Sequence, residues 1–260
     1  MAEFLASLDP KAAEQVEYLL ENVPFAVWET LYSTVLATFF AYVVGLPLGV
    51  ILVVGEERGV LPLPRPLMSV LNVAVNLLRS VPFLILMVVV FPLSRVILGT
   101  SIGTKASIVP LFIASFPFVA RLVEASLREM DRGIIEAAQA MGASPFQIIR
   151  KVILPESLPS LLTGFATAFV TILSYGAMSG AIGGGGLGAM ALNRGYTRHQ
   201  NIVLWAAVVL LVILVQIFQT AGTGLAVRTD RRLSKSGRGR RRKALKKKVD
   251  TEKRFPPGAM

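Results

Sequence analysis

The sequence predicts an all-α protein that is embedded in a membrane and crosses it about five times. Two observations predict this fold class. Hydrophobic residues make up 53% of the 260 residues and the mean hydropathy is +0.63, against an apolar content of roughly 45–50% in ordinary soluble domains. The excess lies in long blocks without charges, and a transmembrane helix needs about 20 consecutive residues of that kind.

Five blocks are long enough to predict membrane spans. The first, fourth and fifth blocks carry no charged residue. The second block contains Pro82 and Pro92, and the third contains Pro110 and Pro117. Proline is tolerated in membrane helices whose neighbours satisfy the freed backbone groups, so we expect one kinked and one distorted span there. The stretch 10–20 is too short and acidic to add a sixth. The expected spans are 30–54, 68–93, 106–125, 157–182 and 202–227.

Two charged residues, Arg79 and Glu124, lie near or within these apolar blocks. A charge at the centre of a membrane helix costs about 2.5–3.5 kcal/mol on insertion scales. We therefore expect both residues at the edges of the membrane, with their charged groups extending to water. The alternative is that they face a partner or a water-filled path inside the bundle.

The composition excludes several kinds of chemistry. The chain has no cysteine and one histidine, His199, which excludes disulfides, thiol catalysis and sites built from clusters of cysteine or histidine. The glycine-rich stretch 183–188 is not followed by Lys-Ser or Lys-Thr, so it lacks the phosphate-binding loop pattern. We expect no metal, cofactor or nucleotide on this chain. The glycines predict an external turn with close helix packing, with a gate hinge as the alternative.

Basic residues are distributed unevenly, although the net charge of the chain is +11. The connection between spans three and four and the polybasic stretch after span five are both rich in Lys and Arg, and with five spans they lie on the same side. Cytoplasmic loops carry an excess of Lys and Arg, so this side is expected to be cytoplasmic.

This orientation predicts three parts of the chain. They are an acidic extracytoplasmic segment over residues 1–27, a membrane domain over 28–227 and a basic cytoplasmic tail over 228–260. The position of the tail directly after a span favours contact with anionic membrane lipid over nucleic acid.

The connection between spans three and four predicts a helical hairpin. It reads DRGIIEAAQAMGASPFQIIRKVILP over residues 131–155. Asp131 is suited to cap a first helix, and Gly142 permits a left-handed backbone at its end. Ser144, followed by proline and then by Gln147 at the third position, has the pattern of a capping box for a second helix.

Apolar residues recur at helical spacing along this hairpin and give it an apolar side. Such a side can enter a groove on another protein, as amphipathic helices do, and Glu136 offers a charge to a basic partner. The alternative is an ordinary surface loop lying on the bilayer. The apolar side consists of Ile134, Ile135, Ala138, Met141, Phe146, Ile149 and Ile153.

The hairpin resembles the EAA loop of ABC importer permeases, whose pattern is EAA-x3-G-x9-I-x-L-P. Every spacing of the pattern is kept, and Val152 stands where isoleucine is usual. The loop also lies in the expected place, between two spans on the basic side. The matching residues are Glu136, Ala137, Ala138, Gly142, Leu154 and Pro155.

The resemblance extends to the methionine-type permease over roughly residues 30–227, and only the two ends depart from it. It is carried by four stretches, which are NLLRSVPFLIL (76–86), RVILGTSIG (95–103), PFVARLVEASL (117–127) and SYGAMSGAIGGGGLG (174–188).

This resemblance implies the type I ABC importer permease fold in a bacterial cytoplasmic membrane. It implies a homodimer above two ATPase subunits, which use the ATP, and an extracytoplasmic methionine-binding protein that delivers the cargo. The six matching loop residues would couple the permease to the ATPase. Met178, within the pattern that includes Tyr175 and Gly180, would narrow the pathway at the dimer axis.

Two alternatives to methionine import stay open. The same machinery could carry another amino acid, an osmolyte or a short peptide, because cargo choice rests largely on the receptor. L-Methionine is the expected cargo, and D-methionine is left open. A membrane enzyme acting on lipid is the other class, but one histidine, no cysteine and few membrane carboxylates count against it.

Overall fold

The chain is predominantly helical in the part that the computed structural model describes, residues 9–229, and has no strand there. The long helices are α2 (Pro10–Val54), α3 (Arg65–Ser80), α4 (Phe83–Leu98), α5 (Thr104–Arg128), α9 (Leu158–Ser179) and α11 (Asn201–Thr229). The short elements are α6 (Arg132–Ala140), α7 (Pro145–Ile148), η1 (Ile149–Ile153), α8 (Leu154–Glu156), η2 (Gly180–Ile182), α10 (Gly186–Ala189) and η3 (Met190–Tyr196).

Four of the described helices are long and apolar enough to cross a membrane, namely α2, α5, α9 with η2, and α11. A fifth crossing results if α3 and α4 count together as one. The prediction of about five spans is therefore confirmed, and the all-α fold class with it.

The expected single kinked helix over 68–93 is replaced by two helices, α3 and α4, bent by 104°. The break lies at Val81 and Pro82, where Val81 has an extended backbone (φ −77°, ψ 127°). A residue before proline is driven out of the helical region by the proline ring. Pro92, Pro110 and Pro117 lie inside continuous helices, so Pro82 alone turns the distortion of this region into a break.

Helix α2 begins at Pro10, well before the expected start of the first span at residue 30. Its early turns pack with Tyr18, Leu19 and Val23 against the region of α10, η3 and α11. The guanidinium of Arg194 lies 4.3 Å from the centre of the Tyr18 ring. The described part of the acidic segment therefore continues the first membrane helix without interruption. Most of the expected basic tail lies outside the described residues.

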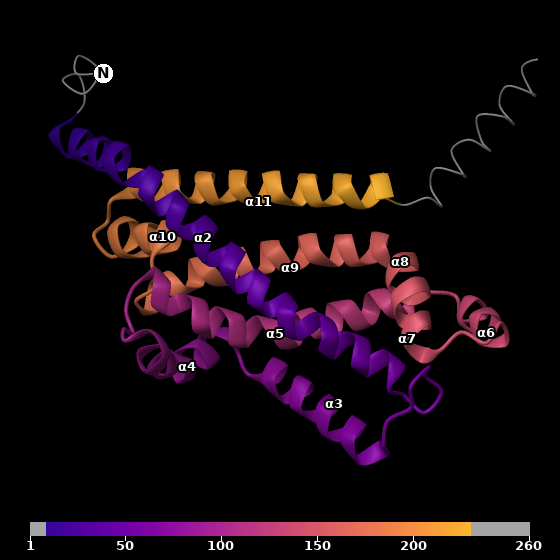
Figure 1. The fold of residues 1–260 in the computed structure, drawn as a ribbon. Coiled ribbons are helices and arrows are strands. Elements are labelled where there is room, and N and C mark those ends of the chain that lie inside the picture. Colours follow the sequence, from indigo (N-terminus) through magenta and orange to yellow (C-terminus); the bar gives the residue numbers. More distant parts are fainter. Residues whose placement is uncertain (1–8, 230–260) are drawn as a thin grey trace, which may run out of the picture.

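Helix α5 lies at the centre of the bundle, between α2, α9 and the bent pair α3 and α4 (Figure 1). Gly45 and Gly49 allow α2 to approach α5 closely. A Cβ atom on Gly49 would lie 2.6 Å from the carbonyl oxygen of Ala120 and 2.7 Å from the Cβ of Val123. Small residues permit such backbone contact between membrane helices.

The bundle has two distinct ends (Figure 1). At one end, which we call the hairpin end, α6, α7 and α8 lie near the last turns of α2, α5 and α11. At the other, the glycine end, α10 lies near the early part of α2 and α4 lies near the start of α5. The hairpin and the end of α11 thus share one end of the molecule.

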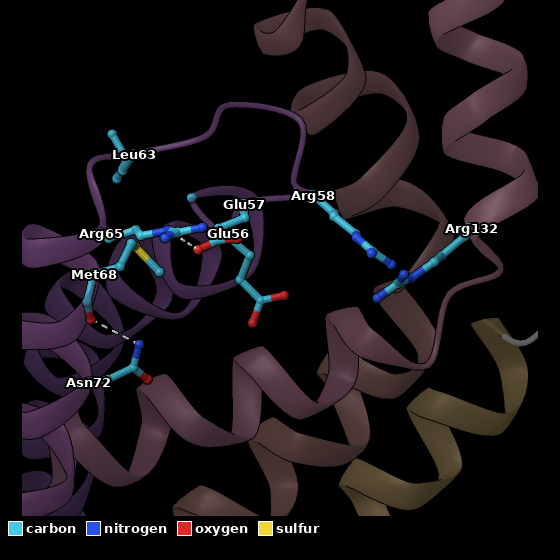
Figure 2. Close-up of a pocket in the computed structure, with 9 residues that line it drawn as sticks. Glu56, Glu57, Arg58, Leu63, Arg65, Met68, Asn72 and Arg132 are labelled. Atoms are coloured by element: carbon cyan, nitrogen blue, oxygen red, sulfur yellow. Dashed lines mark hydrogen bonds and ion pairs between the residues drawn. The ribbon is translucent and has the colours of Figure 1, made fainter.

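The turn that joins α2 to α3 is a small folded structure at the hairpin end (Figure 2). Backbone N–H groups of Gly59, Leu61 and Leu63 donate to carbonyls of Glu56, Val54 and Gly55 at 2.8–3.0 Å. On the surface, the side chains of Arg65 and Glu57 form an ion pair.

We expect Gly49→Ala to destabilise the protein by about 1–3 kcal/mol, the range for forcing extra atoms into a packed interior. The new methyl group would collide with backbone and Cβ atoms of α5. Thermal unfolding of the purified chain in detergent measures the change. Gly224→Ala is the matched control, because no heavy atom lies within 4 Å of its added Cβ. Equal unfolding temperatures for the two variants would contradict the close contact between α2 and α5.

Candidate functional site

The first helix of the predicted hairpin is α6. The Asp131 carboxylate accepts a hydrogen bond from the N–H of Gly133 at 2.9 Å and caps the helix, as predicted. Gly142 has φ +78° and donates its N–H to the carbonyl of Gln139 at 2.9 Å. This left-handed residue ends the helix and turns the chain, which confirms the role predicted for the glycine.

The second helix begins with the predicted capping box. The Ser144 hydroxyl accepts the N–H of Gln147 at 3.4 Å, and the Gln147 side-chain oxygen accepts the N–H of Ser144 at 2.9 Å. The π-helical turn η1 and the short α8, which contains Leu154 and Pro155, then lead into α9. The hairpin is thus joined to a long membrane helix almost without a gap.

One face of the hairpin is anchored in the core. Ala138, Ile148 and Ile153 are buried, and they belong to the same cluster as Leu127 near the end of α5. Leu154 is half-buried against this cluster. Most of the predicted apolar side therefore packs on the protein's own helices, and only part of it is free to enter a groove on a partner.

The opposite face is open to contact. Glu136, Ala137 and Gly142 are exposed, and two large apolar side chains extend outward beside them. Met141 is 81% exposed and Phe146 is 69% exposed. The sequence placed both residues on the apolar side of the hairpin but could not distinguish them from the buried residues of that side. The turn at Gly142 changes the direction of the chain, so helical spacing does not predict which apolar residues point outward.

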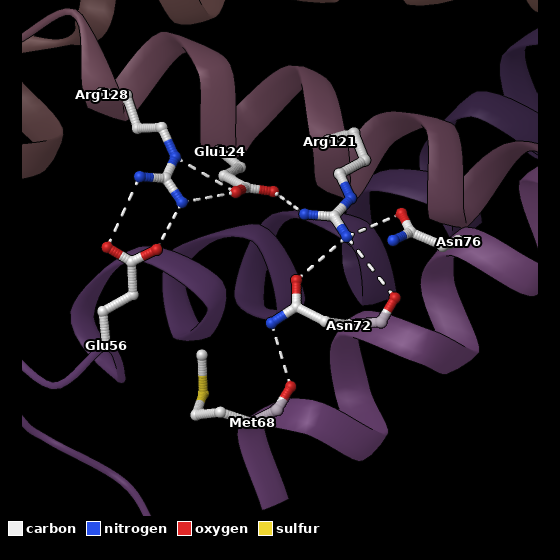
Figure 3. A network of polar contacts seen from close by, with 7 residues as sticks. All are labelled: Glu56, Met68, Asn72, Asn76, Arg121, Glu124 and Arg128. Atoms are coloured by element: carbon white, nitrogen blue, oxygen red, sulfur yellow. Dashed lines mark hydrogen bonds and ion pairs between the residues drawn. The ribbon is translucent and has the colours of Figure 1, made fainter. Parts of the chain in front are cut away.

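A buried carboxylate, Glu124, lies near the end of α5 beside the hairpin (Figure 3). Its oxygens accept hydrogen bonds from Arg121 at 2.5 Å and from Arg128 at 2.8 and 3.1 Å. The prediction that the charged group of Glu124 extends to water is wrong, because the side chain is buried. The residue takes the alternative role instead and faces charged partners inside the protein.

The two arginines extend this network to neighbouring helices (Figure 3). Arg128 binds Glu56, just after α2, at 2.5 Å. Arg121 donates to the side-chain oxygens of Asn72 and Asn76 on α3 at 3.0 and 2.8 Å. The network therefore joins α2, α3 and α5 directly behind the hairpin.

The residues expected at the pathway lie at the other end of α9. Met178 is 48% exposed in the last turn of this helix. The Tyr175 ring stacks on Phe83, the first residue of α4, with the ring centres 4.0 Å apart. Gly180 is buried, and a Cβ added there would lie 2.3 Å from the backbone nitrogen of Ala189. The structure thus brings the three residues to the glycine end, next to the break before α4.

Glu29 holds the glycine-rich stretch, a role that sequence reasoning missed. Its carboxylate accepts the Thr104 hydroxyl at 2.6 Å and the N–H of Gly186 at 2.9 Å. The neighbouring Thr30 hydroxyl accepts the N–H of Leu187 at 2.9 Å. Glycines are required here because side chains would clash with Ala177 and Thr104. The close packing expected for this stretch is confirmed.

A bundle of membrane-crossing helices with a firmly anchored, outwardly exposed hairpin at one end defines the class of transport subunits that take their energy from a bound partner. The chain matches the family model for binding-protein-dependent transport system inner membrane components over residues 45–235. This match covers well over half of the chain, which therefore belongs to that family. It is a permease component rather than an enzyme.

Curated relatives and solved structures agree with this family. The chain is 49% identical over 207 residues to the probable D-methionine transport system permease protein MetI of Vibrio cholerae, covering 80% of this chain and 92% of the relative. It is 47% identical over 154 residues to the D-methionine transport system permease protein MetI of Escherichia coli, covering 59% and 70%.

Among solved structures, an inward-facing conformation of the MetNI methionine ABC transporter matches with a TM-score of 0.80 and 44% identity. The match covers 83% of this chain and 99% of the chain in that structure. An amino acid ABC transporter with histidines matches with a TM-score of 0.69 at 20% identity, which reflects the shared fold. The predicted type I ABC importer permease fold is confirmed.

We expect Glu124→Gln to destabilise the protein by about 2 kcal/mol, below the roughly 3–5 kcal/mol for breaking a fully buried ion pair, because the Arg128 side chain is 45% exposed. Thermal unfolding of the purified chain measures the change. Glu57→Gln is the matched control, since it breaks an exposed pair with Arg65 that contributes about 0–1 kcal/mol. Equal losses in the two variants would contradict the special role of the buried carboxylate.

Proposed function

We propose that this chain is the permease subunit of a methionine importer and that its hairpin couples it to a separate ATPase. The exposed face of the hairpin carries this proposal. Met141 and Phe146 stand out from a structure whose other side is fixed in the core. Exposed apolar groups on a rigid support are suited to fill pockets on a partner protein.

The partners follow from this arrangement and from the family. Two ATPase subunits would bind the hairpins of two copies of the chain and would use the ATP, so the chain itself would need no cofactor. A solute-binding protein would deliver the cargo at the glycine end. The MetNI transporter, a methionine ABC transporter that this chain resembles at 44% identity, supports the partnership with an ATPase.

The orientation follows from the charges. The hairpin end carries Arg128, Arg132 and Arg150, whereas Glu14 and Glu17 lie on the early turns of α2. The excess of Lys and Arg in cytoplasmic segments supports a hairpin in the cytoplasm and an acidic N-terminal segment outside, in the bacterial inner membrane.

Within the hairpin, the six residues of the EAA pattern would have different tasks. Glu136 and Ala137 would touch the ATPase, since both are exposed. Ala138 and Leu154 would transmit the motion inward, because they pack against the core cluster. Gly142 would fix the turn, and the exposed Pro155 in α8 would mark the passage into the membrane helix.

Met178 would form the narrow point of the pathway near the dimer axis. It extends from the last turn of α9, while Tyr175 and Gly180 on either side of it are fixed by stacking and by close backbone packing. An exposed, flexible thioether between two fixed residues can change its rotamer without disturbing the helix. ATP and the loaded receptor would favour different states of the gate through their differential affinities.

We expect the chain, reconstituted into vesicles with its ATPase and receptor, to accumulate labelled L-methionine only when ATP is supplied. The relatives named as D-methionine transport permeases support including D-methionine as a competitor. Unlabelled glycine betaine, other amino acids and short peptides serve as further competitors. Stronger competition by one of these than by methionine would overturn the assigned cargo while leaving the importer class intact.

A second prediction concerns the turn of the hairpin. We expect Gly142→Val to reduce ATP-dependent uptake about tenfold, because a β-branched residue at positive φ strains the backbone by about 1–2 kcal/mol or more. No heavy atom lies within 4 Å of the added Cβ, so backbone strain is the main change that we expect. Gly142→Asn is the control, since asparagine tolerates this conformation. Normal uptake by the Gly142→Val variant would contradict the role assigned to the hairpin.

A further inference from the structure

A pocket of about 530 Å³ lies at the hairpin end, between the turn after α2, the start of α3 and the start of α6 (Figure 2). Its volume is within the range of about 300–1,000 Å³ that is typical of small-molecule sites. Neither the EAA pattern nor the pathway uses it. The lining residues that matter here are Arg58, Leu63, Arg65, Met68, Asn72 and Arg132.

Two arginines at this pocket differ from the charged residues around them. Glu57 pairs with Arg65, and Glu56 pairs with Arg128. Arg58 and Arg132 point toward one another in Figure 2, and within residues 9–229 neither forms an ion pair with a carboxylate. Arginine side chains in proteins carry a positive charge.

Like charges that face each other across a pocket repel unless an anion lies between them. A guanidinium group presents several N–H donors in a fixed plane, and two such groups can each bind two oxygens of one phosphate. The geometry of Arg58 and Arg132 is therefore suited to a phosphate group, because each unesterified phosphate oxygen can accept hydrogen bonds from both guanidinium groups.

The support of each arginine is rigid. The turn that carries Arg58 is closed by three backbone hydrogen bonds, and its Gly59 packs so tightly that a Cβ would lie 2.2 Å from the carbonyl of Val54. Arg132 is the first residue of α6, directly after its cap Asp131. The spacing of the two side chains is thus set by folded backbone on both sides.

We propose that Arg58 and Arg132 form a binding site for a phosphate group, supplied by the headgroup of an anionic phospholipid. The apolar wall of the pocket, Leu63 and Met68, and the exposed Leu61 and Leu67 beside it favour a lipid over a free ion. The pocket also lies where the apolar block of α2 ends. Basic pockets between membrane helices on the cytoplasmic side are suited to anionic headgroups.

A phospholipid bound here bridges the turn after α2 and the first helix of the hairpin. It neutralises the two arginines and holds α6 against the α2–α3 turn. The composition of the membrane then influences the position of the coupling element. This inference is independent of the cargo, so its failure would leave the proposed import function untouched.

The test is native mass spectrometry of the full chain, purified in detergent in its assembly and titrated with phosphatidylglycerol. We expect Arg58→Gln combined with Arg132→Gln to weaken retention of phosphatidylglycerol at least tenfold. Arg79→Gln combined with Arg95→Gln is the matched control, because it removes the same two charges from exposed positions on α3 and α4. Arg132→Glu is a second variant that lets Arg58 pair within the protein, and it should abolish retention without weakening the fold.

Two further arms identify the source of the phosphate. Diacylglycerol, which has the same acyl chains but no phosphate, should be retained equally by all variants, and inorganic phosphate at millimolar concentration should not displace phosphatidylglycerol. Displacement by inorganic phosphate would support the phosphate site and overturn the lipid source. Unchanged lipid retention in the double variant would overturn the site itself. If the double variant lost its co-purifying ATPase but retained the lipid, the two arginines would bind carboxylates of a protein, and the lipid site would also be overturned.

Discussion

Helices α2 and α5 are fastened to each other at both ends, and the rest of the bundle is arranged around this pair. Glu29 binds the Thr104 hydroxyl at the glycine end, and Glu56 binds Arg128 at the hairpin end. The two carboxylates are 27 residues apart, or about 40 Å along a helix at 1.5 Å per residue. The hydrocarbon core of a bilayer is about 30 Å thick, so both polar clamps can lie outside it, while two glycines of α2 allow close contact in between.

This pair explains why the hairpin is rigid. The chain leaves α5 at Arg128 and enters α6 at Arg132, with Met130 buried between them. Ala138 of the hairpin packs in the same buried cluster as Val54 and Leu127, which lie at the ends of α2 and α5. A force on the exposed face of the hairpin is therefore passed to two clamped helices together, because close-packed interiors transmit displacement instead of absorbing it.

Local signals in the sequence predicted the hairpin well because caps and turns depend on a few neighbouring residues. Asp131, Gly142 and Ser144 each act as their side chains or backbone freedom require. Contacts between residues far apart in the sequence could not be predicted in this way. The partners of Glu124 and Glu29 lie on other helices, and hydropathy alone cannot show whether a carboxylate reaches water or an arginine. The split of the apolar side likewise depends on how the hairpin rests on α5.

The bent pair α3 and α4 links the clamped pair to the residues beside the proposed gate. Helix α3 is held to α5 through Asn72 and Asn76, which accept hydrogen bonds from Arg121. Helix α4 begins beyond the break with Phe83, whose ring stacks on Tyr175 of α9. The Ser94 hydroxyl of α4 also donates to the carbonyl of Ala106 on α5 at 2.8 Å, so α4 is held to both α5 and α9. Pro82 at the break has no N–H to donate, so these contacts set the angle between α3 and α4. A displacement of the hairpin end can thus reach Tyr175 and Phe83, beside the proposed gate residue Met178, while the contacts of Glu29 and Glu56 are kept.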